Sequence, residues 1–284
     1  MHKPNKDIIY INNHSLSLDK FKFHNFLKKN IFDGKIIIFR KNKLIFELIR
    51  EIELLSLKLG MSRIISERLN LKKRNIEKKI IFLQNLIKRN IQIKKKFSGF
   101  LYTIGFESES TFMDKICLRY SNSFSKNQLG ILKSLGPHRD TWGSNIFEQI
   151  NWWFPTHNIE SLNSLFIVPC KFSKKIINNS NSWNFEKHKQ NPKNVNSSPE
   201  AEKKKINNKI IFKLNKGDII CFSGHHLHGT NHGKTVRISI ETRTVSLQDK
   251  KKFLIPKNLD SNSKIIKSNW FKNIENGACL SRFY

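Results

Sequence analysis

The second part of the sequence is divided into short apolar segments, and this division constrains the fold more than any other feature. The segments are rich in β-branched and aromatic residues and are separated by Gly, Pro, Asn or Ser. They begin near residue 97 and read FLYTIGF, KICLRYS, QINWWFPT, LFIVPC, KIIFKLN, DIICFSG and VRISIETRTV. Runs of this length and composition between turn-forming residues are typical of β-strands. Their number predicts a β-sandwich or jelly roll with helices packed outside it.

The region before residue 97 has a different pattern. The segment GKIIIF at 34–39 predicts a short buried strand after a glycine turn. Residues 42–60 predict a helix that ends at Gly60, a residue type common just after a helix C-terminus. Its apolar residues at helical spacing are Leu44, Leu48, Leu55 and Leu59. A second helix is predicted over about 66–92, where the apolar stripe is Ile76, Ile80, Leu83 and Ile87.

These patterns predict three regions in the chain. Residues 1–96 form an N-terminal region of helices and a strand that packs on the core, and residues 97–250 form the β core. Within the core, residues 173–208 are poor in apolar residues and rich in Asn, Ser and Lys, which predicts a long, mobile insertion between two strands. Residues 251–284 form a C-terminal extension whose more apolar end, ACLSRFY, is expected to dock back onto the body.

The charge of the chain is extreme. Lys and Arg number 52 against 22 Asp and Glu, which gives a formal net charge of +30. Such a field would attract nucleic acid, anionic lipid or phosphorylated small molecules. The lysines are spread along the whole chain, however, and Lys, Asn, Ile and Phe all have AT-rich codons, so compositional bias of the genome is the favoured explanation.

Cysteine usage and the N-terminus predict a cytoplasmic location. Four cysteines without a CxxC pair, most of them in or beside apolar runs, predict buried free thiols in a reducing compartment. The N-terminus lacks the apolar region of a signal peptide, and no apolar run approaches the length of a membrane-spanning helix.

The stretch LGPHRDTWGS at 135–144 contains the first candidate ligands. If His138, Arg139 and Asp140 form a strand, alternation places His138 and Asp140 on one face and Arg139 on the other. An imidazole and a carboxylate so placed could bind one metal ion. H-x-D alone is weak evidence, since it occurs by chance in many proteins.

A histidine-rich turn further along the chain offers the missing ligand. The predicted strand Ile219 to Phe222 leads into His225, His226, His228 and His232, and a strand with Arg237 and Ser239 on one face follows. The alternative is a His-rich loop that binds metal loosely or not at all. Two histidines and one carboxylate form the facial triad of non-haem Fe(II) oxygenases. If the co-reductant is 2-oxoglutarate, the guanidinium of Arg237 can bond its far carboxylate and Ser239 can add a hydroxyl donor.

With these residues together, the sequence resembles the Fe(II)/2-oxoglutarate-dependent dioxygenases. PHRDTW, QINWWFP and FSGHHLHGT are most similar to the phytanoyl-CoA dioxygenase-like branch, over about residues 97–247. The resemblance implies a double-stranded β-helix core. In that family the distal histidine stands about ten residues before the arginine. His228 precedes Arg237 by nine residues and His226 by eleven, so His228 is favoured and His226 stays open.

The resemblance also implies the site and its chemistry. Iron ligands would be His138, Asp140 and His228, and Arg237 with Ser239 would hold 2-oxoglutarate. Family halogenases replace the carboxylate with a small residue, so Asp140 favours hydroxylation, or a related oxidation, of a small-molecule substrate by O₂, with release of succinate and CO₂.

Other residues are weaker candidates for contacts with cosubstrate or substrate. Gln149 and Asn151 share a predicted strand face and could bond the cosubstrate, or could serve a structural hydrogen bond. Arg119 lies in an apolar strand and either contacts an anionic substrate or reaches solvent. Trp142 either walls the substrate pocket or packs in the core, and Trp183 in the insertion could tether a lid.

The sequence is also compatible with three other functions. The first is an oxygenase that acts on nucleic acid or on a protein docked through a basic patch, favoured only by the charge. The second is a jelly-roll module that binds metal or is catalytically silent. The third is a zinc hydrolase, for which the sequence offers no HExxH-type helix to supply a general base. The sequence does not identify the substrate or the oligomeric state.

Overall fold

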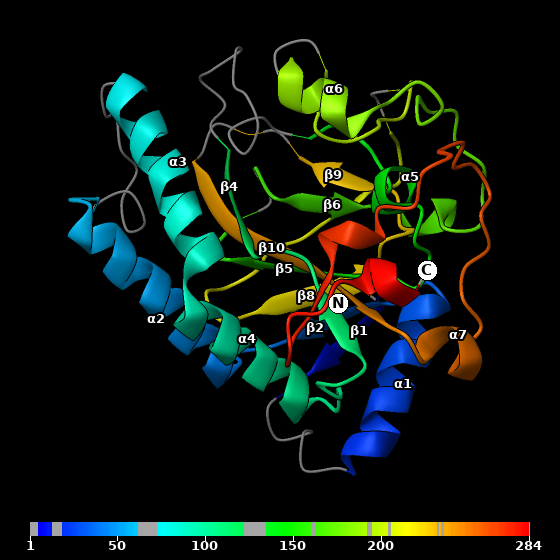
Figure 1. The fold of residues 1–284 in the computed structure, drawn as a ribbon, viewed down its shortest axis with the longest axis horizontal. Coiled ribbons are helices and arrows are strands. Elements are labelled where there is room, and N and C mark those ends of the chain that lie inside the picture. The colour runs from blue at the N-terminus through cyan, green and yellow to red at the C-terminus, as the bar shows by residue number, and fades with distance from the viewer. Residues whose placement is uncertain are drawn as a thin grey trace.

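The computed structural model describes residues 5–12, 19–61, 73–121, 135–160, 163–191, 195–203, 206–231, 233 and 236–283. The described chain forms a β-sheet core with flanking helices, as the segment pattern predicted (Figure 1). Its helices include none that is long and apolar enough to cross a membrane.

The secondary structure follows the chain in this order. The described helices are α1 (Lys20–Phe32), α2 (Lys43–Lys58), α3 (Lys73–Arg89), α4 (Ile91–Thr103), α5 (Asp140–Ser144), α6 (Phe185–Gln190) and α7 (Asp249–Lys252). The described strands are β1 (Ile8–Ile11), β2 (Ile36–Phe39), β3 (Thr111–Met113), β4 (Cys117–Ser121), β5 (Ile150–Pro155), β6 (Leu165–Ile167), β7 (Ile210–Ile211), β8 (Ile219–Ser223), β9 (His228–Thr230), β10 (Arg237–Ser246) and β11 (Lys272–Asn273).

The strands form two sheets. The larger has the order β1-β2-β8-β5-β10-β3-β11, with β4 also paired to β10, and the smaller has the order β7-β6-β9. The ten-residue strand β10 is the centre of the larger sheet, because it pairs antiparallel with β3, β4 and β5. Strands distant in the sequence therefore lie side by side, which brings the histidine-rich turn near the segment that precedes α5.

Each face of the larger sheet has its own core. Strand β5 shows the division: Ile150, Trp152 and Phe154 pack with the helices, whereas Trp153 packs between the two sheets with residues of β6 and β8. The predicted alternation of QINWWFP is confirmed. In Figure 1, α2, α3 and α4 lie together along one side of the sheet. The inner face between the sheets also carries polar side chains, among them Asn151 and Ser239, and this is where the site lies.

The two predicted N-terminal helices are present. Helix α2 ends in a Schellman arrangement, in which Met61 N donates to Ser56 O at 2.9 Å and Gly60 adopts a positive φ of 63°. Its fully buried stripe is Ile45, Leu48, Ile49 and Ile52, so of the predicted stripe only Leu48 is fully buried. In α3, Ile80, Leu83 and Ile87 are buried as predicted. Residues 66–72 of the predicted helix, and the side chain of Ile76, lie outside the described residues.

The prediction of a strand at FLYTIGF is wrong. Residues 100–103 belong to α4, whose N-cap Asn90 accepts hydrogen bonds from the backbone of Gln92 and Ile93. Its buried residues Ile93, Phe97, Phe100 and Leu101 recur at helical spacing. A short apolar and aromatic run does not distinguish a buried helix from a strand, and here tertiary packing decides.

The N-terminal region does more than cover the core. Strand β2 pairs antiparallel with β8 through Ile37 and Cys221, and β1 extends the sheet in parallel. Strands β1 and β2 of the N-terminal region therefore complete the larger sheet.

The insertion and the C-terminal extension are tied to the body. The described part of the insertion lies between β6 and β7, and Ala201 N donates to Pro137 O at 2.8 Å just before the candidate site. The C-terminal extension docks back as predicted, with Phe271 and Leu280 packed in a small core with Phe112. All four cysteines are free, but only Cys221 is fully buried and Cys170 is exposed, which corrects the prediction of buried thiols.

Candidate metal centre and cosubstrate site

His138 and His228 face each other across an isolated antiparallel bridge. Each backbone N–H donates to the carbonyl of the other residue at 2.9 Å. The H-R-D segment is not a strand throughout, which corrects the prediction: Arg139 is extended, with φ −114° and ψ 135°, and Asp140 is the first residue of the short helix α5. Arg139 does point away from the site, and its buried guanidinium lies 2.6 Å from His225 Nε2.

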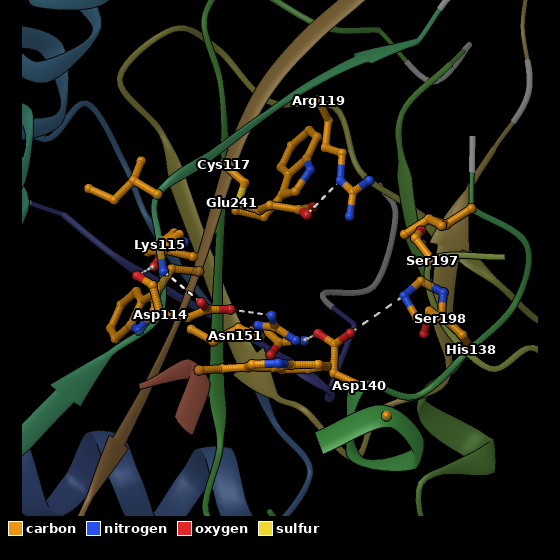
Figure 2. A pocket seen from close by; sticks show the side chains of 18 of the residues that line it. Asp114, Lys115, Cys117, Arg119, His138, Asp140, Asn151, Ser197, Ser198 and Glu241 are labelled. Carbon is orange, nitrogen blue, oxygen red and sulfur yellow. Dashed lines mark hydrogen bonds and ion pairs between the residues drawn. The ribbon is translucent and has the colours of Figure 1, made fainter. Parts of the chain in front are cut away.

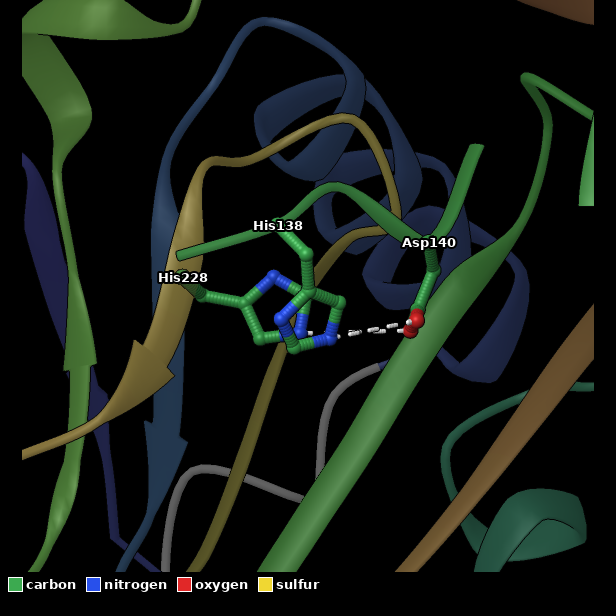
Figure 3. Close-up of side chains that lie close together, drawn as sticks. All are labelled: His138, Asp140 and His228. Atoms are coloured by element: carbon green, nitrogen blue, oxygen red, sulfur yellow. Dashed lines mark ion pairs between the residues drawn. The ribbon is translucent and has the colours of Figure 1, made fainter. Parts of the chain in front are cut away.

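Three ligand-type atoms converge at this bridge. His138 Nε2 lies 3.6 Å from Asp140 Oδ1, and His228 Nε2 lies 4.0 Å from Asp140 Oδ2. One potential ligand atom from each residue lies within 4.8 Å of the others. Figure 3 shows both rings directed at the carboxylate. Ligands at about 2.1 Å from a common ion stand about 3 to 3.5 Å apart, so a small contraction would let all three bind one metal.

The second nitrogen of each ring is fixed by the backbone. His138 Nδ1 lies 2.8 Å from Gly136 O, and His228 Nδ1 lies 2.9 Å from His226 O. A carbonyl oxygen can only accept, so in the neutral imidazole Nδ1 carries the proton and Nε2 keeps a lone pair. Metal-binding histidines are oriented in this way. Two lone pairs and a carboxylate facing one another repel unless a cation lies between them.

The electrostatics of the site favour a neutral His228 ring facing an ionised Asp140. Burial lowers the pKa of His228 to about 4, and the neighbouring His138 acts in the same direction. Burial acts to raise the pKa of Asp140, but the charges of Arg243 and the two histidines outweigh it, so the pKa of this carboxyl lies below its ordinary value. At neutral pH the site therefore offers a neutral His228 and a carboxylate.

The structure brings His228 to the site, and not His226. The ring of His226 is buried elsewhere, with Nε2 3.1 Å from Gly34 O and Nδ1 3.2 Å from Ser223 O. His225 contacts Arg139. His232 lies outside the described residues.

Arg237 and Ser239 share the inner face of β10, as alternation predicted. Arg237 donates to Asn163 O at 3.2 Å and to Thr230 Oγ1 at 3.3 Å, and it lies over the ring of Trp153. Within the described chain, Arg237 Nε and Ser239 Oγ are buried without a hydrogen-bond partner. Buried polar atoms normally have partners, so these two orphaned donors fit a site for an oxyanion.

Gln149 and Asn151 form a relay to the candidate ligand. Gln149 Nε2 donates to Asn151 Oδ1 at 2.8 Å, and Asn151 Nδ2 donates to Asp140 Oδ2 at 2.7 Å. Asn151 lines the cavity, whereas Gln149 is fully buried behind it. Gln149 is therefore placed to position Asn151, and of the two alternatives its placement favours the structural hydrogen bond.

The two substrate candidates have different surroundings. Arg119 lines the cavity and donates to Glu241 at 2.6 Å. Trp142 is fully buried in a small core with Phe166 and Leu227, and its Nε1 donates to Asp260 Oδ1 at 2.7 Å. Trp142 is not among the described residues that line the cavity, so its placement favours the alternative of core packing.

The cavity beside the candidate ligands has a volume of about 730 Å³. It lies between the sheets, and Figure 2 shows Asp114, Arg119, Asp140, Asn151 and Glu241 around it. Trp183 of the insertion and Trp270 of the C-terminal extension also line it. The volume is ample for a small organic molecule.

Sequence reasoning missed three charged residues of this region. Glu241 and Arg243 continue the inward face of β10, so the alternation that selected Arg237 and Ser239 could have found them. Arg243 forms an ion pair with Asp114. Asp260 accepts hydrogen bonds from Trp142 Nε1 and from the backbone N–H of Ile176. No local sequence pattern predicts this role.

Comparisons with known proteins identify distant structural similarities only. No family profile matches the chain, and no curated protein matches it. The epimerase SnoN, in complex with Fe³⁺, α-ketoglutarate and nogalamycin RO, has a TM-score of 0.44 and 10% identity over 80% of this chain and 85% of that chain. EvdO2 from Micromonospora carbonacea var. aurantiaca, complexed with 2-oxoglutarate, has a TM-score of 0.46 and 8% identity over 82% of this chain and 94% of that chain. At this level of similarity, function has to be judged from the residues of the site.

Proposed function

We propose that this protein is a non-haem Fe(II)/2-oxoglutarate-dependent oxygenase that hydroxylates a small-molecule substrate, with a double-stranded β-helix core of the phytanoyl-CoA dioxygenase-like branch. The observation that carries the proposal is the convergence of His138, Asp140 and His228 with both Nδ1 atoms held by backbone carbonyls. Two imidazoles and one carboxylate suit Fe(II) and leave positions open for cosubstrate and oxygen.

The residues near the metal centre fit 2-oxoglutarate. Arg237 is fully charged at neutral pH, since burial lowers its pKa only to about 10. A guanidinium can bond both oxygens of a carboxylate, and the orphaned Nε of Arg237 and hydroxyl of Ser239 are the donors that such a group would satisfy. A carboxylate there would also balance the buried positive charge.

Each side chain has a definable part in this activity. Iron and 2-oxoglutarate, when held by these residues, would supply oxidation of the substrate by O₂, with succinate and CO₂ as coproducts. His138 and His228 present fixed lone pairs, and Asn151 holds the carboxylate of Asp140 in place. Arg237 and Ser239 orient the cosubstrate. Aromatic side chains from the insertion and the C-terminal extension line the cavity and would contact a bound substrate.

The proposal is tested by the spectrum of the protein with Fe(II) and 2-oxoglutarate without oxygen. A weak visible charge-transfer band is expected, and Asp140→Ala should abolish it. Glu186→Gln, which alters another acidic residue lining the cavity, should leave it intact. A wild-type protein that gives no band under these conditions is a silent module and overturns the proposal. Under oxygen, incubation with host metabolite extract should yield products heavier by one oxygen atom.

A further inference from the structure

The inner face of β4 carries an arginine whose charged end is only partly used by the protein. Leu118 and Tyr120 face the helical core, so Arg119 between them faces the cavity. Its Nε donates to Glu241 Oε1 at 2.6 Å. Within the described chain, no residue accepts a hydrogen bond from its two terminal nitrogens, and the side chain is 19% exposed. Arg119 thus offers donors and a positive charge to a molecule in the cavity.

Arg119 is a guanidinium separate from Arg237, although it lies beside the residues assigned to the cosubstrate, because it pairs with Ser239 of β10. In Figure 2, Arg119 and Glu241 lie across the open cavity from Asp140 and His138. Arg119 is the register partner of Ser239 on β10. Arg237 lies two residues before Ser239 in the same strand. Three arginines are among the described residues that line the cavity: Arg119, Arg237 and Arg243. Arg243 is paired with Asp114, and the far carboxylate of 2-oxoglutarate needs only one guanidinium, so Arg119 is left for another ligand.

An aromatic cluster forms another part of the cavity wall. Phe185 of α6 lies 5.0 Å from Trp270 and 6.1 Å from Trp183, measured between ring centroids. All three rings line the cavity, and they come from the insertion and the C-terminal extension. Such a wall suits an apolar or aromatic part of a ligand.

The number of charges alone does not single out this cavity. Among the described residues, nine basic and four acidic side chains line it. That proportion is close to the 52 basic and 22 acidic residues of the whole chain. The placement is what matters, because Arg119 is on the face of β4 that lines the cavity. Lys88 and Lys115 are exposed at the rim and form no ion pair with a described carboxylate, so they add a long-range attraction for anions.

We propose that Arg119 binds an oxyanion group of the primary substrate, a carboxylate or a phosphate, while Trp183, Phe185 and Trp270 contact an apolar or aromatic part of the same molecule. The inference rests on the proposed function, since this substrate is the molecule oxidised beside the metal. Glu241 holds Arg119 in position and lowers the attraction for anions, so its removal should act in the opposite direction to the removal of Arg119.

The experiment uses the full-length, metal-free protein at low salt, so that it does not depend on catalysis. Phenyl phosphate and phenylacetate are the probes, benzyl alcohol is the neutral comparison, and tryptophan fluorescence and calorimetry report binding. At least one anion should bind at least tenfold more tightly than benzyl alcohol, and the tighter of the two identifies the preferred oxyanion. Arg119→Gln should lower the affinity for that anion at least tenfold.

Two further variants make the result independent of folding defects. Glu241→Gln leaves the guanidinium without its carboxylate, so it should tighten anion binding, an effect that a merely structural role of the pair does not produce. Lys58→Gln removes a positive charge at the exposed end of α2, outside the cavity, and should leave binding unchanged. Equal affinities of wild type and Arg119→Gln, or equal affinities for the anions and benzyl alcohol, would overturn the inference.

The failure of this inference can be distinguished from failure of the proposed function. Arg119→Gln could lower the affinity for 2-oxoglutarate as strongly as a change at Arg237 does. In that case Arg119 belongs to the cosubstrate site, so the inference is overturned while the oxygenase proposal stands. If the probes bind through Arg119 but wild type gives no band with Fe(II) and 2-oxoglutarate, the cavity binds anions and the oxygenase proposal fails.

Discussion

The amide of Asn151 donates a hydrogen bond to Asp140 Oδ2 at 2.7 Å, on the carboxylate oxygen that lies 4.0 Å from His228 Nε2. The carboxylate is therefore oriented by a neighbouring strand, since Asn151 is on β5 and Asp140 begins α5. Gln149 in turn donates to Asn151. The candidate ligands are therefore oriented in two ways. Backbone carbonyls fix the two histidine rings, and the Gln149–Asn151 relay fixes the carboxylate of Asp140.

Loss of this relay should weaken metal binding. Asn151→Ala removes the hydrogen bond that orients Asp140, so we expect Fe(II) affinity to fall by about 10- to 100-fold. Gln149→Ala should have a smaller effect, because it acts only through Asn151. Anaerobic metal titration measures both. An affinity of Asn151→Ala within twofold of wild type would show that the relay is not needed.

Changes at Arg237 and Ser239 should affect the cosubstrate and not the metal. Arg237→Lys keeps the charge but loses the planar fork, so we expect the 2-oxoglutarate affinity to fall at least tenfold, or by about 1.4 kcal/mol. Ser239→Ala removes one donor and should cost less. Titration of the anaerobic charge-transfer band reports cosubstrate affinity, and metal titration is the control. A parallel loss of Fe(II) affinity would contradict the assignment.

The metal-free protein should lose stability as the pH falls below 6.5. Burial lowers the pKa of His24 and His225 to about 3, and that of His226 and His228 to about 4. Between these values and 6.5 the unfolded chain binds protons that the folded chain does not. Each such histidine therefore lowers the free energy of unfolding by about 1.4 kcal/mol per pH unit as the pH falls. Their stabilising effect is complete above pH 6.5.

Urea denaturation with a chelator present, at several pH values from 7 to 5, tests this expectation. His24 packs edge-on against Phe106, and its buried Nδ1 has no hydrogen-bond partner in the described chain. His24→Leu should therefore fold. It should also reduce the pH dependence of the free energy of unfolding by the amount that corresponds to about one proton taken up on unfolding. A stability that does not change between pH 7 and pH 5 would contradict the burial of neutral histidines.

A buried ion pair far from the site should be important for stability. Lys28 Nζ lies 2.5 Å from Asp249 Oδ1, and the two side chains are 1% and 2% exposed. Asp249→Ala leaves the ammonium of Lys28 buried without its carboxylate, so we expect a loss of about 3 to 5 kcal/mol in the free energy of unfolding. The double variant Lys28→Met with Asp249→Leu should recover most of this loss.

The exposed pair of Lys213 and Glu160 provides the comparison for these measurements. Its side chains are 68% and 79% exposed. Removing either partner should change the free energy of unfolding by less than about 1 kcal/mol, because water screens the charges. If removing one partner lowers the free energy of unfolding by similar amounts in the buried and the exposed pair, burial does not determine the size of the loss.

Some of the site could be predicted from the sequence because it depends on local patterns. Period-two alternation places Arg237 with Ser239, and Asn151 with Trp153, on inward faces of their strands. The same alternation would have included Glu241 and Arg243. The stop of α2 at Gly60 is likewise local, since a left-handed residue after a helix favours glycine.

By itself the sequence determined which side chains each strand turns inward and which residues could bind a metal. Only the tertiary structure decided that His228 meets His138 and Asp140, that Trp142 packs in the core, and that residues 100–103 are helical. The physical reason is that alternation and capping act over a few residues. Pairing of distant strands and burial against a particular neighbour are set by how the whole chain packs.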